Sequence, residues 1–136
     1  ITMSKQVNRR NAEDALLSVT KALPAAAASN ETDAIYIGPA GPHREKMKLR
    51  ASWPANAVLV ATKILTLALK SGATSSTTAE ADPAQTYVIT GDTGFAAGYV
   101  DFELGQNVLD YVTVSQTVET GGGSNIGTTF TYTLVS

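Results

Sequence analysis

The sequence predicts an all-β fold, a single-domain sandwich of short strands preceded by an N-terminal arm. Apolar and polar residues alternate with a period of two from Ala34 onward, as in strands that bury one face. Clusters of glycine, proline and asparagine interrupt the alternation, as in connections between strands. The 136 residues, 43% of them hydrophobic, suffice for one domain with a real core.

The chain begins with a polar stretch that has no apolar period. We assign residues 1–15 to a flexible, basic N-terminal arm and residues 16–136 to the sandwich domain. The boundary lies where apolar residues begin to recur, because an arm without them has no face to bury.

Residues 11–28 fit two interpretations. In the first, Asn11 caps a short helix that places Leu16, Val19 and Leu23 on one face and ends at Pro24. In the second, residues 16–28 are extended. The side chains of residues 25–28 are too small to anchor a core, so we expect a spacer there, with close packing on a neighbouring segment as the alternative.

Seven or eight strands are expected after residue 33. They lie at residues 34–37, 47–53, 58–69 (one or two strands), 86–90, 99–104, 111–118 and 129–134. The connection at residues 71–84 is polar and, at fourteen residues, longer than usual, so we expect it to be either mobile or used for contacts. Short strands at this spacing, without a repeat or βαβ alternation, favour a jelly-roll-like sandwich.

The last two strands should organise the fold as an antiparallel hairpin. Each alternates apolar residues with threonine or serine, and the glycine-rich residues 121–125 lie between them. Their hydroxyl faces would offer hydrogen-bonding surfaces. The residues predicted to be buried are Leu65, Leu67, Phe102, Val112, Val114, Phe130 and Leu134.

The charge distribution is uneven and argues for a basic arm. Residues 1–50 contain eight Lys/Arg and five Asp/Glu, a net charge of +3, whereas residues 51–136 contain two and seven, a net charge of −5. No basic stripe alternates with aromatics, so we expect no nucleic-acid binding, and the longest apolar run, residues 57–69, is too short for a membrane span. Lys5, Arg9 and Arg10 are the candidate partner-binding residues, with a merely solvated end as the alternative.

No catalytic, metal or cofactor site is visible in the sequence, and we predict that the chain is not an enzyme. His43 is the only histidine and lies among glycine and proline, and there is no cysteine. Asp101 and Glu103 alternate along one strand, which is typical of exposed charge and lacks a histidine, metal or lysine partner. Calcium binding by Glu80, Asp82 and Asp92 lacks a recognisable series of ligands.

The order of segments resembles that of a small capsid cement, or decoration, protein of tailed bacteriophages, of the single-domain jelly-roll kind. The segments that carry the resemblance are residues 25–30, 33–38, 47–51, 83–86 and the closing residues 110–136 with their glycine-rich turn. It spans about residues 16–136, and the arm before Asn11 departs from it.

The resemblance implies a non-enzymatic virion protein that binds the capsid exterior and reinforces contacts between major capsid subunits. We therefore expect the major capsid protein as partner and a homo-oligomer, a dimer or trimer, without a cofactor. The alternatives are a carbohydrate-binding or lectin-like β-sandwich, or a phage tail or fibre domain. The aromatic residues that could stack on sugars are Trp53, Tyr36, Tyr87, Tyr99, Tyr111 and Tyr132. Trp53 lies on the apolar side of its strand, so we expect it in the core.

Overall fold

A computed structural model of the chain describes residues 18–38, 41–42, 46–74, 85–105 and 108–135. The strands are β1 (Ser18–Ala22), β2 (Ser29–Glu31), β3 (Ile35–Tyr36), β4 (Lys48–Trp53), β5 (Ile64–Gly72), β6 (Gln85–Thr90), β7 (Gly98–Glu103), β8 (Tyr111–Val118) and β9 (Thr129–Val135). Within these ranges, no helix has the length and apolar character needed to cross a membrane.

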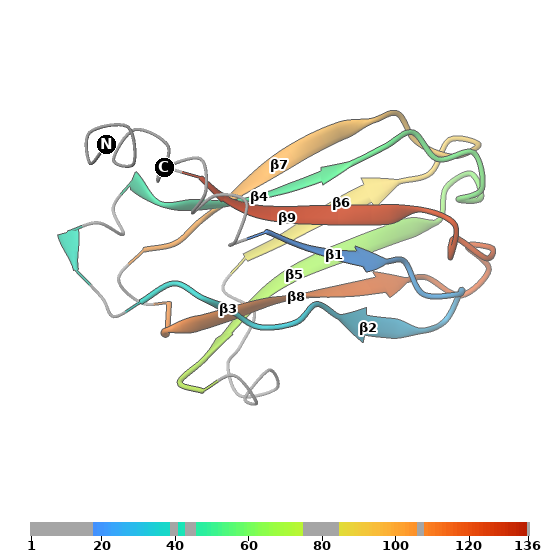
Figure 1. The fold of residues 1–136 in the computed structure, drawn as a ribbon. Helices are drawn as coiled ribbons and strands as arrows, with labels where there is room; N and C mark the ends of the chain where they lie inside the picture. The colour runs from blue at the N-terminus through green and yellow to red at the C-terminus, as the bar shows by residue number, and fades with distance from the viewer. Residues whose placement is uncertain (1–17, 39–40, 43–45, 75–84, 106–107, 136) are drawn as a thin grey trace, which may run out of the picture.

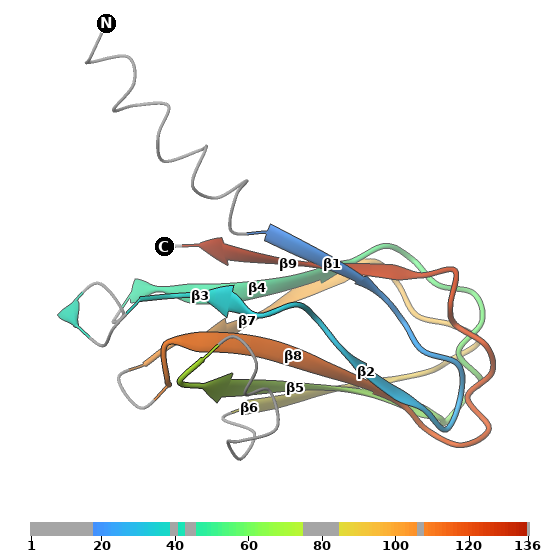
Figure 2. The same ribbon diagram turned by 60° about the horizontal axis from the view of Figure 1, so that its bottom comes forward.

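The strands form two antiparallel sheets that pack face to face (Figures 1 and 2). The first sheet has the order β1-β9-β4-β7 and the second has the order β2-β8-β5-β6, with β3 also paired to β8. β3 continues the line of β2 along β8, since Glu31 lies opposite Ser115 and Ile35 lies opposite Val112. The predicted all-β sandwich is confirmed.

The strand pairs are nested in sequence, which is the topology of a jelly roll. β1 pairs with β9, β2 and β3 pair with β8, β4 pairs with β7, and β5 pairs with β6. The chain is therefore one long hairpin that reverses between β5 and β6. Pairing of β4 with β9 and of β5 with β8 rolls this hairpin into two sheets.

The predicted hairpin of the last two strands is wrong. β8 belongs to the second sheet and β9 to the first, so residues 119–128 cross between the sheets. The two strands instead face each other across the core, where the Tyr132 hydroxyl donates a 2.6 Å hydrogen bond to Oε1 of Gln116. A glycine-rich turn between two half-apolar strands permits either arrangement, because both bury the same faces.

The core agrees with the pattern of alternation. All seven residues predicted to be buried are at most 3% exposed: Leu65, Leu67, Phe102, Val112, Val114, Phe130 and Leu134. Trp53 also faces inward as expected, with its ring stacked 5.2 Å from that of Phe130. Burial of large side chains at this density contributes roughly 1.5–3 kcal/mol each to stability.

Residues 18–22 form strand β1, so the extended interpretation is correct there and the helix is wrong. Val19 faces the core opposite Tyr132, and β-branched residues such as Val19 and Thr20 favour a strand once a neighbour is available. Residues 11–17 lie outside the described ranges. The alanine segment is also more than a spacer, because the Ala27 N–H donates to the Val118 carbonyl at 3.0 Å.

One buried asparagine joins connections at the end of the sandwich where β4 ends and β9 begins. Asn56 Nδ2 donates to Asn125 Oδ1 at 3.0 Å and to Thr128 Oγ1 at 2.7 Å. Asn56 Oδ1 accepts the N–H groups of Val58 and Leu59 at 2.8 and 2.9 Å. All four hydrogen bonds that its amide group can readily make are therefore formed, and they tie the β4–β5 connection to the β8–β9 connection.

The apolar run at residues 57–69 is only partly core. Val58 and Val60 are 48% and 44% exposed, because the chain turns before β5 and Thr62 has a positive φ of 68°. One strand, not two, follows, and its alternation buries the predicted leucines from Leu65 onward.

Candidate functional site

The outer face of the first sheet carries polar side chains in two rows across its four strands. The first row is Ser18, Thr133, Arg50 and Asp101, and the second is Thr20, Thr131, Ser52 and Tyr99. Each row follows the strand register, which sets directly opposed side chains about 4.5–5.5 Å apart. We call these eight residues the polar face.

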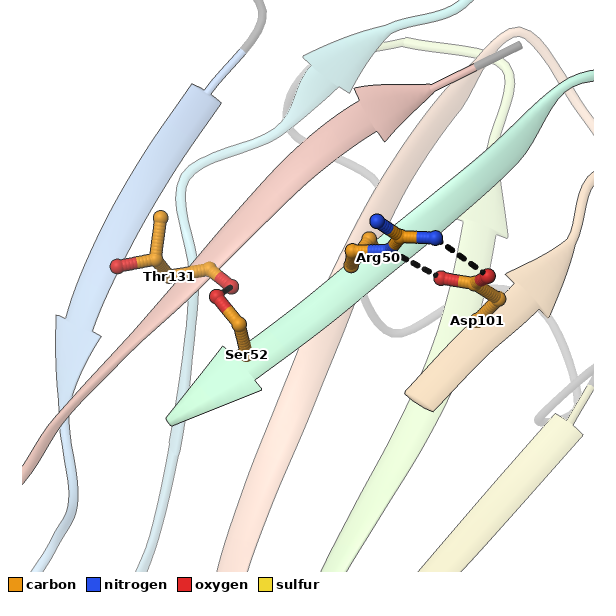
Figure 3. Close-up of polar contacts among 4 residues, drawn as sticks. All are labelled: Arg50, Ser52, Asp101 and Thr131. Carbon is orange, nitrogen blue, oxygen red and sulfur yellow. Dashed lines mark hydrogen bonds and ion pairs between the residues drawn. The ribbon is translucent and has the colours of Figure 1, made fainter. Parts of the chain in front are cut away.

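Arg50 and Asp101 form the charged part of the polar face (Figure 3). Arg50 Nε donates to Asp101 Oδ1 at 2.8 Å and Nη2 donates to Oδ2 at 3.1 Å, so the pair is bidentate. The guanidinium group also lies over the Tyr99 ring, 4.4 Å from its centroid. The sequence alone does not indicate this cluster, because Arg50 is far from Asp101 and Tyr99 along the chain and only the pairing of β4 with β7 brings them together.

The ion pair keeps both groups charged. The hydrogen bond from Arg50 lowers the pKa of Asp101 below its usual value, and the same bond raises the pKa of Arg50. Asp101 is therefore poorly suited to donate a proton near neutral pH. Two of the five guanidinium N–H groups bond to Asp101, which leaves others for a partner.

The hydroxyl groups of the polar face are held by the sheet. Ser18 Oγ lies 3.1 Å from Thr133 Oγ1 in a cross-strand hydrogen bond. The Ser52 hydroxyl donates to the Thr131 carbonyl at 3.4 Å (Figure 3). A hydroxyl group both donates and accepts, so these rows present hydrogen-bonding groups whose positions are already fixed before binding. The predicted hydroxyl face of β9 is therefore part of the surface.

The corresponding face of β8 presents a hydroxyl at the surface only at Thr117, which is exposed and lies 2.8 Å from the Ser29 hydroxyl in a cross-strand hydrogen bond. Thr113 and Ser115 are only 3% and 8% exposed. Lys70 lies opposite Thr113, Glu31 lies opposite Ser115, and their charged ends meet at 3.4 Å. These two long side chains cover the hydroxyls of Thr113 and Ser115, so the expected hydroxyl surface of β8 is wrong at these two residues and holds only at Thr117.

Several residues considered in the sequence analysis lie outside the described ranges. The candidate partner-binding residues Lys5, Arg9 and Arg10 are among them, as are His43 and residues 75–84 of the long polar connection. Ser71 and Gly72, expected in that connection, instead end β5.

The described residues hold no group of three or more His, Cys, Asp or Glu placed to bind a metal ion. Glu80 and Asp82 of the calcium hypothesis are not described, and Asp92 is exposed. For sugar stacking, Trp53 is 9% exposed and Tyr132 fully buried, so neither offers a ring face. Tyr36 and Tyr99 are 52% and 61% exposed.

Comparison with known proteins bears on the fold. No protein-family model and no curated protein match the sequence. The crystal structure of PirA is similar over 88% of this chain and 94% of that chain, with 12% identity and a TM-score of 0.50. A structure from the disulfide-linked pili of Bacillus endospore appendages matches over 86% of this chain and 81% of that chain, with 17% identity and a TM-score of 0.45. Neither is a phage cement protein, and the likeness to PirA extends to the β-rich fold alone.

Proposed function

We propose that this chain is a capsid decoration protein of a tailed bacteriophage. It binds the outer surface of the shell as a homo-oligomer, stabilises contacts between major capsid subunits and catalyses no reaction. The observation that carries the proposal is the polar face, a rigid hydrogen-bonding surface on a jelly-roll core. The resemblance in segment order supports the same role.

The polar face suits a partner that is itself a folded protein surface. Its hydroxyls and its Arg50–Asp101 pair are positioned by four paired strands, so little conformational entropy is lost when they bind. A protein that binds only the assembled shell stabilises it by about 2.7 kcal/mol per site when its free concentration is a hundredfold above Kd. Repetition over a symmetric lattice multiplies that effect.

The basic arm supplies the second contact in this proposal. Lys5, Arg9 and Arg10 would bind acidic groups of the major capsid protein. Ordering an arm costs roughly 1–2 kcal/mol per residue, and charge-assisted hydrogen bonds would offset this cost. Attachment should weaken as salt rises, because exposed pairs are screened beyond about 8 Å at physiological ionic strength.

The test is co-sedimentation of the purified protein with emptied, expanded capsids of its phage. Thr131→Lys places a long charged side chain in the middle of the polar face, and Thr117→Lys is its matched control on the other sheet. Each threonine lies between two hydroxyl residues of neighbouring strands: Thr20 and Ser52 for Thr131, and Ser29 and Thr66 for Thr117. We expect Thr131→Lys to lose most binding and Thr117→Lys to retain it.

Deleting residues 1–10 should leave the sandwich folded, reduce binding and remove most of the salt dependence. Equal binding by Thr131→Lys and Thr117→Lys would contradict a role for the polar face, and equal binding by the intact and truncated proteins at every salt concentration would reduce the arm to a solvated end. If the unaltered protein does not sediment with capsids, the decoration role itself is wrong.

The exposed rings of Tyr36 and Tyr99 favour a carbohydrate-binding sandwich as the second candidate. Tyr36 lies 5.0 Å from Tyr111, ring centroid to ring centroid, at a tilt of 49°. Binding to a glycan array that is lost in Tyr36→Ala, without binding to capsids, would favour this candidate. Purified tails in the sedimentation assay test the tail or fibre alternative in the same way.

A further inference from the structure

Within the described part of the chain, strand β6 is an unprotected edge of the second sheet. It lies at the end of the strand order, and four of its residues, Thr86, Tyr87, Val88 and Thr90, are exposed. Its sequence, Gln-Thr-Tyr-Val-Ile-Thr, contains no charge, proline or glycine. An uncharged edge strand of this length and β propensity readily pairs with another chain.

The other edges in the described sheets are blunted. β1 includes Lys21, and β2 and β3 have only three and two residues, with Glu31 in β2. β7 carries the charged residues Asp101 and Glu103, and the side chain of Gln85 hydrogen-bonds to its backbone at Glu103. The Gln85 amide both donates to the Glu103 carbonyl, at 2.5 Å, and accepts the Glu103 N–H, at 3.1 Å. Proteins use charge, short length and cover of this kind to prevent edge pairing, and β6 has none of them along its centre.

The hydrogen bonds of β5 show which backbone N–H and C=O groups of β6 point to the open edge. The Ile64 carbonyl of β5 accepts the Glu119 N–H at 3.0 Å, whereas the neighbouring Lys63 carbonyl accepts the Gly91 N–H at 2.8 Å. In antiparallel sheets this alternation continues along the strand, so odd-numbered residues of β5 bond to β6. The β6 partners that bond to β5 are then Gln85, Tyr87 and Ile89. The N–H and C=O groups of Thr86, Val88 and Thr90 point to the open edge.

We propose that two copies of this chain pair antiparallel along β6, with Val88 of one copy opposite Val88 of the other. This inference deepens the homo-oligomer part of the proposed function and rests on it for its role at the capsid. The pairing extends the second sheet continuously from one copy to the other. It is isologous, since the same strand serves both sides of a two-fold axis.

The register around Val88 is self-complementary. It forms three hydrogen-bonded residue pairs with two bonds each, about six backbone hydrogen bonds in all. Valine then faces valine, and Thr86 faces Thr90 on either side of the axis. Pairs of β-branched residues and of threonines are favourable across strands, and no like charges meet.

The partial exposure of Tyr87 supports the pairing of a second copy along β6. Its side chain points to the core side of the sheet, 6.0 Å from Trp53 between ring centroids, yet it is 38% exposed. In the proposed register Tyr87 lies opposite Ile89 of the second copy. The second copy therefore continues the apolar layer over a ring that the single chain leaves partly open.

The test is a charge exchange at the two-fold axis, followed by sedimentation velocity over a range of concentrations. Val88→Lys and Val88→Glu each place two like charges opposite each other, whereas an equimolar mixture of the two variants places opposite charges there. The side chain of Val88 is exposed, so both variants should fold, which circular dichroism checks. Thr117→Lys is the matched control, because Thr117 is exposed on the same sheet and lies on β8, two strands away from β6.

We expect the unaltered protein and Thr117→Lys to be dimers. For each Val88 variant alone, the protein concentration at which the dimer dissociates should be more than tenfold higher than for the unaltered protein. The equimolar mixture should restore the dimer. A protein that is monomeric at every concentration, Val88 variants that stay dimeric, or a mixture that stays monomeric would overturn the inference. If the protein binds capsids as a monomer, the β6 pairing is wrong and the decoration role stands. If the protein forms the β6 dimer but does not bind capsids, the pairing stands and the decoration role is wrong.

Discussion

Replacing Asn56 with alanine should destabilise the sandwich by about 4 kcal/mol. The change removes four hydrogen bonds, two that join the β4–β5 connection to the β8–β9 connection and two within the β4–β5 connection. Two of the groups left behind have no access to water, Oδ1 of Asn125 and the N–H of Leu59, both in residues that are 1% exposed. A buried polar group without a partner costs roughly 1–3 kcal/mol, so two such groups account for the estimate. Domains are typically stable by only about 5–15 kcal/mol.

Urea unfolding followed by circular dichroism measures this change. Asn56→Asp should cost less than alanine, because a carboxylate still accepts the two N–H bonds and can accept the Thr128 hydroxyl, so that only the bond donated to Asn125 has no replacement. Ser52→Ala is the control, since it removes a single 3.4 Å hydrogen bond at the surface and should change stability by no more than about 0.5 kcal/mol. An alanine variant that loses less than about 1 kcal/mol, or an aspartate variant that loses as much as alanine, would refute this role for the network.

Three further changes probe the core and the charged pair. Phe130→Ala should cost about 3–5 kcal/mol, because the side chain is fully buried; an unchanged melting temperature would contradict this. Burial raises the pKa of Tyr132 well above its usual value, whereas the unfolded chain ionises near pH 10. The native protein should therefore lose about 1.4 kcal/mol of stability per pH unit above about pH 10. Tyr132→Phe should lack this slope in urea unfolding, and an identical slope would show that another group causes it. Because Arg50 lowers the pKa of Asp101, stability from the pair is present at pH 7 and is lost as pH falls through that lowered value. Asp101→Asn should melt slightly earlier at pH 7 and converge with the native protein in acid, and a difference that persists there would contradict an electrostatic origin.

Alternation along the chain was sufficient to predict the strands and their buried faces. β4 and β9 each carry apolar residues at every second position, and Leu49, Phe130 and Leu134 are buried accordingly. Alternation does not specify which strands become neighbours. The β8–β9 hairpin was wrong for this reason, since a strand buries the same face beside its partner or across the core from it. Residues 18–22 were ambiguous because five residues with few apolar positions fit either period.

The candidate site was predictable only in part. The outward threonines of β9 follow directly from alternation. Arg50 beside Asp101 does not, because 51 residues separate them and only the pairing of β4 with β7 joins them. The cover over Thr113 and Ser115 also depends on two strands far apart in sequence, because β5 places Lys70 opposite Thr113 and β2 places Glu31 opposite Ser115. The surface chemistry of a sheet depends on which side chains lie side by side on neighbouring strands, whereas a single sequence shows only which side chains follow one another along each strand.

The nested strand pairs also set the order in which the chain can fold. Ile64 and Thr90, which pair in the innermost hairpin, are 26 residues apart (64 to 90), whereas Ser18 and Thr133 of the outermost pair are 115 apart. Closing longer loops costs more entropy, and folds dominated by distant pairings fold in about milliseconds to seconds. In the described sheets β1 pairs with β9 alone, whereas β4 pairs with both β7 and β9. During synthesis β1 therefore has no partner, and β4 has only β7, until residues 129–135 have left the ribosome. The first sheet, and the polar face with it, is therefore completed only when β9 joins β1 to β4.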